Sequence, residues 1–63
     1  MTPEEENETR AEAERLRELP LDERKAFIAM LRSDAQNRKL SKRDRELSRE
    51  RAELLAKLLR LKT

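Results

Sequence analysis

The chain contains no glycine, and this absence limits its fold more than any other feature of its 63 residues. Glycine takes the positive φ angles of tight hairpins and phosphate-binding loops, and ordinary domains contain about 7% of it. A chain that lacks it, and that is rich in Glu, Arg, Leu and Ala, favours helices joined by short loops. We therefore expect an all-α protein, with neither hairpin-rich sheets nor a loop that cradles phosphate.

Helix start and stop signals divide the chain into three segments. Thr2 is the expected N-cap of the first helix, where Glu5 completes a capping box. Pro20 stops that helix, and Asp22 is the expected N-cap of the next one. The sequence predicts helices over about residues 3–19, 23–36 and 42–62.

The loop at residues 37–41 separates the second helix from the third. Asn37 is expected to take the left-handed conformation that closes a helix, and Ser41 is expected to cap the third helix. Loops this short make neighbouring helices antiparallel, so residues 1–63 are predicted to form one domain, an up-down-up three-helix bundle. The alternative is a long helical hairpin or coiled coil, whose heptads Pro20 and this loop would interrupt.

Six consecutive apolar residues, Ala26–Leu31, stand out in a chain that is 48% charged. At about 100° per residue, this helix has an apolar arc of roughly 200°, which suits a helix that touches two neighbours. Ala29 falls outside the arc, and Met30 lies on one flank. The predicted core combines this stripe with the leucine-rich end of the third helix and with the end of the first. Its members include Leu16, Leu19, Phe27, Ile28 and Leu31.

Charge is distributed unevenly along the chain. Residues 1–23 carry a net charge of −6 and residues 24–63 a net charge of +8, for a total of +2. Helices of opposite charge packed side by side explain this pattern; a basic surface for nucleic acid or for an acidic partner is the alternative. Arg51, on the apolar face of the third helix, is expected either to extend its charged end to solvent or to pair with Glu8, Glu12 or Asp34. The candidate basic patch comprises Arg38, Lys39, Lys42, Arg43, Arg45 and Arg49.

Residue types that carry out chemistry are scarce. The chain has no cysteine and no histidine, so we expect no disulfide, no soft-metal site and no imidazole for acid–base catalysis. The glutamates at residues 4–8 indicate a favoured helix start rather than a cation site. The leucines of 54–59 resemble a coactivator-type docking motif, a pattern that leucine-rich core helices also produce. We expect no enzyme, no cofactor, no metal, no targeting signal and no membrane segment.

The segment "LPLDERKAFIAML", Leu19–Leu31, is similar to two families of helical bundles. It resembles the second helix of protein A immunoglobulin-binding domains and the opening of sigma factor region 4. Over its whole length the chain resembles de novo designed helical miniproteins, through "TPEE", the capping boxes and the "LPLDER" joint. A small natural or phage protein is the alternative origin, favoured by the glycine-free loops and by the excess of Arg over Lys.

The resemblance to designed miniproteins implies a protein that binds an unidentified protein target through one rigid helical face. A binder needs exposed apolar residues that its own core does not use. The alternatives are a stable or self-associating scaffold, which would make the chain its own partner, and a small nucleic-acid-binding module. The candidate protein interface comprises Ala26, Ala29, Met30, Ser33, Leu55 and Leu59.

Overall fold

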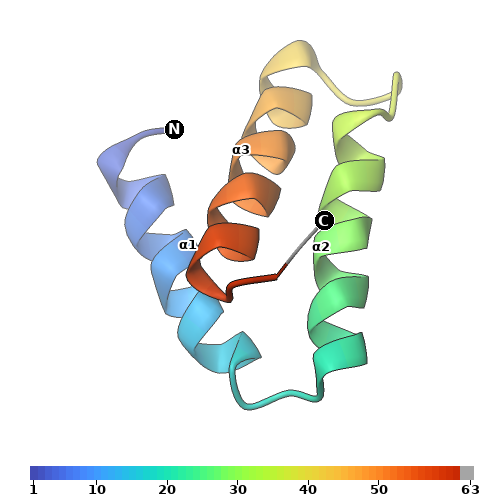
Figure 1. The fold of residues 1–63 in the computed structure, drawn as a ribbon. Coiled ribbons are helices and arrows are strands. Elements are labelled where there is room, and N and C mark those ends of the chain that lie inside the picture. The colour runs from blue at the N-terminus through green and yellow to red at the C-terminus, as the bar shows by residue number, and fades with distance from the viewer. Residues whose placement is uncertain (62–63) are drawn as a thin grey trace.

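The computed structural model describes residues 1–61 and contains three helices (Figure 1). They are α1 (Pro3–Leu16), α2 (Leu21–Ala35) and α3 (Lys42–Leu58). Successive helices run in opposite directions, which confirms the predicted all-α, up-down-up arrangement. The Cα radius of gyration is 11.3 Å, close to the value of about 11 Å expected for a compact chain of this length.

The central helix of the bundle is α3. Both α1 and α2 pack against it, whereas α1 and α2 contact each other only marginally. Figure 1 shows α3 lying between the other two helices. The expectation that the second helix touches two neighbours is therefore wrong, because α3 takes that position and buries apolar residues on two sides.

The hydrophobic core forms where the three helices meet. Leu55 is fully buried at 0% exposure, and Ile28 and Leu31 of α2 pack into the same cluster. Thr9 is the one buried polar residue within residues 1–61, and its hydroxyl donates a 2.8 Å hydrogen bond to the carbonyl of Glu5, which satisfies it. The apolar core comprises Ala13, Leu16, Ile28, Leu31, Ala52, Leu55, Ala56 and Leu59.

The junction between α1 and α2 differs from the predicted boundaries. The capping box of Thr2 and Glu5 is confirmed. However, α1 ends at Leu16 rather than at residue 19, because the last residues before Pro20 tighten into i→i+3 hydrogen bonds. Leu19 consequently leaves the predicted core and is 39% exposed. The second helix begins at Leu21 with Pro20 as its N-cap, so Asp22 lies inside the helix and does not cap it.

The loop between α2 and α3 closes without a left-handed residue. The prediction for Asn37 is wrong, since Arg60 is the one residue with a positive φ within residues 1–61. Instead, the side-chain carbonyl of Asn37 accepts a 3.0 Å hydrogen bond from the backbone N–H of Lys39, which forms a local Asx-type turn. The cap at Ser41 is confirmed by a 3.1 Å hydrogen bond from the N–H of Asp44.

The third helix ends at Leu58, earlier than predicted. Arg60 takes the left-handed conformation at φ 56°. Its N–H donates to Lys57 O at 3.3 Å, and the N–H of Leu61 donates to Ala56 O at 2.9 Å. These two hydrogen bonds form a Schellman motif, which satisfies the last carbonyl groups of the helix. The predicted end at residue 62 lies outside the described residues.

Candidate functional site

Four of the predicted interface residues form one exposed stripe on α2. Ala26, Ala29, Met30 and Ser33 are all exposed, and we call this surface the α2 outer face. Their spacing of i, i+3, i+4 and i+7 places them on adjacent turns of one side of a helix. Met30 is 48% exposed, which makes it the most exposed large apolar side chain within residues 1–61. Helical geometry turns this face away from α3 because Ile28 and Leu31 occupy the inward positions.

Leu55 and Leu59 do not belong to any accessible surface. Leu55 is 0% exposed, and Leu59 is also buried in the core. Their placement in the candidate interface is therefore wrong. The physical reason is the central position of α3, which needs apolar residues toward both α1 and α2 and leaves no leucine edge for a partner.

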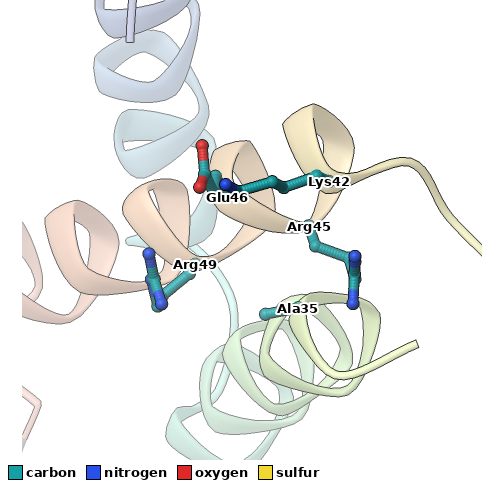
Figure 2. Close-up of a pocket in the computed structure, with 5 residues that line it drawn as sticks. All are labelled: Ala35, Lys42, Arg45, Glu46 and Arg49. Atoms are coloured by element: carbon teal, nitrogen blue, oxygen red, sulfur yellow. The ribbon is translucent and has the colours of Figure 1, made fainter. Parts of the chain in front are cut away.

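A groove between the end of α2 and the first half of α3 collects part of the predicted basic patch. One section, of about 240 Å³, is lined by Ala35, Lys42, Arg45, Glu46 and Arg49. Figure 2 shows Arg45 and Arg49 pointing toward the end of α2 on either side of Ala35, while Lys42 and Glu46 lie on the side of α3 turned away from it. An adjoining section of about 330 Å³ is lined by Arg32, Ala35, Gln36, Arg49, Ala52 and Glu53. We call the two sections together the basic groove.

The other members of the predicted basic patch lie elsewhere. Arg38 and Lys39 are exposed in the loop, and Arg43 faces α1, where it forms a 3.7 Å ion pair with Glu5. The sequence patch therefore divides between two sides of α3. Arg32 of α2, which lines the basic groove, was not among the predicted residues. Its spacing of three residues from Ala35 could have indicated that both residues lie along the same groove.

The contact between α1 and α3 is held by cross-helix ion pairs. Arg51 donates to Glu12 at 2.5 Å, one of the three partners predicted for it, and both side chains are partly buried. The N-terminal amine pairs with Glu50 at 2.9 Å. The amine–Glu50 pair has the opposite polarity, but charge complementarity between the acidic first helix and the basic third helix is confirmed by the pairs of Glu12 with Arg51 and of Glu5 with Arg43.

Two ionisable groups on this side have perturbed pKa values. Hydrogen bonds from Thr2, first from its backbone N–H, lower the pKa of Glu5 below the ordinary 4.5. The hydrogen bond and the charge of Glu50 raise the pKa of the N-terminal amine above the ordinary 8.0. Both shifts come from structural contacts at the start of α1, so they do not indicate an acid–base site.

Residues 1–61 bring no three acidic side chains together in a way that could hold a metal ion. None of the helices in this described part is both long and apolar enough to cross a bilayer. The class that the geometry defines is a three-helix bundle with one exposed helical face and one basic groove. Comparisons of the chain with protein-family models, with curated proteins and with solved structures found no match.

Proposed function

We propose that this chain is a non-catalytic helical miniprotein that binds a protein partner through the α2 outer face. The observation that carries the proposal is Met30, a large apolar side chain that is 48% exposed on a helix whose inward positions are already filled. An apolar residue that the core does not use costs solubility when it stays in water. Such a residue is available to anchor an interface.

The spacing of the α2 outer face supports helix recognition. Positions i, i+3, i+4 and i+7 are the anchors by which an amphipathic helix lies in a partner's groove. Ala26 and Ala29 are small, so a partner surface can approach the backbone of α2 closely while Met30 fills a pocket. Methionine suits this role because its unbranched thioether adapts to irregular pockets.

The outward faces of α1 and α3 are less suited to such an interface. The exposed side of α1 carries Glu4, Glu6 and Glu14, and that of α3 carries Lys57 and Glu53. Charged residues are depleted at the centres of protein interfaces. The α2 outer face has four exposed uncharged residues on adjacent turns, one of them the large apolar Met30, and this favours it over the other two helices.

The proposed origin, a designed sequence, is supported by several local features. The capping box of α1, the proline at its first turn and the Ser41 cap of α3 follow design rules. An uncapped α2 start and a left-handed arginine depart from those rules. The binding proposal does not depend on this origin.

A charge inserted into the α2 outer face tests the proposal. Immobilised wild type, Met30→Arg and Ala11→Arg are compared for the proteins that each retains from a cell extract, with circular dichroism to check folding. Ala11 is exposed on α1, so it controls for an added arginine elsewhere. We expect at least one protein that the wild type and Ala11→Arg retain equally and that Met30→Arg retains about 10-fold less, the effect of losing one anchor.

Two results would contradict the proposal. Identical sets of retained proteins on all three forms would show that the α2 outer face recognises nothing. Concentration-dependent self-association in sedimentation, lost in Met30→Arg, would assign the face to a second copy of the chain and support the scaffold alternative.

A further inference from the structure

We propose that the basic groove is a second binding site, which takes a glutamate-bearing helix of another protein. The inference starts from two pairs of arginines on α3. Arg43 and Arg51 face α1, where each pairs with a glutamate, at Glu5 and Glu12. Arg45 and Arg49 face α2, where they line the basic groove. The same helix therefore carries one pair of arginines that has glutamate partners on α1 and a second pair that faces α2.

No carboxylate within residues 1–61 forms an ion pair with Arg45 or Arg49. The residues that α2 contributes to the groove are Arg32, Ala35 and Gln36, none of which is acidic. Lys42 and Glu46 lie on the side of α3 turned away from α2 (Figure 2), so the charged side chains that remain in the groove are three arginines and one carboxylate, that of Glu53. An excess of positive charge in a concave surface attracts an acidic partner.

Arg45 is partly desolvated before any partner binds. Its Nε is buried and has no hydrogen-bond partner among the described residues. A buried donor of this kind is uncommon in native structures, and a cation that has lost part of its hydration gains more from a carboxylate than a fully exposed one. In Figure 2 the guanidinium group of Arg45 lies beside Ala35 and is directed at the basic groove.

The contact between α1 and α3 shows how an acidic helix satisfies arginines on this scaffold. Glu5 and Glu12 lie two turns apart on α1 and reach two arginines that lie about two turns apart on α3. In the basic groove, Arg45 and Arg49 are one turn apart, a rise of about 6 Å. A helix with glutamates at i and i+4 presents its carboxylates at the same spacing, so it fits alongside α3 as α1 does.

Features of the groove favour an acidic helix over nucleic acid. Ala35 lines both sections of it, and its small side chain lets a helix backbone approach. Glu53 interrupts the positive surface, which opposes a continuous phosphate backbone but not spaced glutamates. The single aromatic residue, Phe27, packs against the core and offers no platform for stacking bases.

The test uses the full chain and a fluorescein-labelled alanine-based helical peptide with glutamates at every fourth position. Binding is followed by fluorescence anisotropy for the wild type, Arg49→Gln and Lys57→Gln. Lys57 is exposed on the same helix and outside the basic groove, so its loss removes an equal charge as a matched control. We expect Arg49→Gln to weaken binding about 5-fold, the size of a partly exposed ion pair, and Lys57→Gln to leave it nearly unchanged.

Further arms decide between this partner and the alternatives. The glutamine counterpart of the peptide is expected not to bind, and affinity is expected to fall at about 0.5 M salt, where the Debye length is about 4 Å. Equal weakening by both variants, or no binding of the glutamate peptide, would overturn the inference. Tighter binding of a DNA oligonucleotide of equal charge, with the same loss in Arg49→Gln, would assign the groove to nucleic acid instead.

The basic groove and the α2 outer face lie on different sides of α2, so the two proposals fail independently. Met30→Arg is expected to leave binding of the glutamate peptide unchanged. If it weakened peptide binding as much as Arg49→Gln does, the two surfaces would form one site and the groove would not be a separate one.

Discussion

Replacement of Leu55 by alanine tests the packing of α3 as the central helix. Leu55 is 0% exposed and belongs to the core that joins all three helices. Leucine-to-alanine substitutions in protein cores cost about 2–5 kcal/mol, and the cost is greatest where the surroundings cannot collapse. Because Leu55 is enclosed on both sides of α3, we expect a loss of about 3–4 kcal/mol in the free energy of unfolding.

A loss of this size is a large fraction of the total stability. At about 0.05–0.15 kcal/mol per residue, a chain of 63 residues has a free energy of unfolding of about 3–9 kcal/mol. With a urea m value of about 1 kcal/mol/M, the midpoint of unfolding shifts down by about 3–4 M. Leu55→Ala is therefore expected to be marginally folded at room temperature.

The assay is urea unfolding followed by circular dichroism, with Met30→Ala as the matched control. Met30 is 48% exposed, so its truncation is expected to cost less than about 1 kcal/mol. A loss below about 1 kcal/mol for Leu55→Ala, or equal losses for the two variants, would refute the assignment of Leu55 to the core and Met30 to the surface.

Other predictions follow from the contacts of α1. Glu12→Gln leaves Arg51 partly buried without its carboxylate, and urea unfolding is expected to show a loss of about 1–2 kcal/mol; no loss would mean that the pair is fully solvated. The lowered pKa of Glu5 means that its stabilising contribution is present above pH 4.5 and is lost as pH falls through the lower folded-state pKa. Glu5→Gln is expected to remove this acid-side change in melting temperature, because it removes the carboxyl that titrates, and an unaltered pH profile would contradict the assignment. The pKa of the N-terminal amine is raised, so its contribution is complete below pH 8.0 and is lost as pH rises through the raised value. Glu50→Gln is expected to remove that alkaline change, which is measured as the melting temperature at a series of pH values above 8.0.

The number and order of the helices could be predicted because they depend on local signals. The caps at Thr2 and Ser41 need only neighbouring residues and their backbone N–H groups. The ends of the helices depend on competing local geometries, and here the prediction was less accurate. Arg60 in the left-handed region is an example, since this conformation costs a non-glycine residue about 1–2 kcal/mol and nothing in its sequence context predicts it.

The candidate site could be predicted only in part because it depends on which helix is central. Periodicity identified the apolar side of α2, but the helix that touches two neighbours is α3. This single fact buries Leu55 and Leu59 and leaves Met30 exposed. The division of the arginines between two sides of α3 has the same origin, since it follows from where α1 and α2 pack and not from charge along the chain.

The central claim, that the α2 outer face meets a partner, is tested most directly by site-specific photocrosslinking. A photoreactive amino acid replaces Met30 in one form and Ala11 in another, and each form is irradiated in cell extract. We predict a discrete adduct with a different protein from position 30 and none from position 11. No adduct from position 30, the same adducts from both positions, or an adduct formed only with a second copy of the chain would contradict the claim.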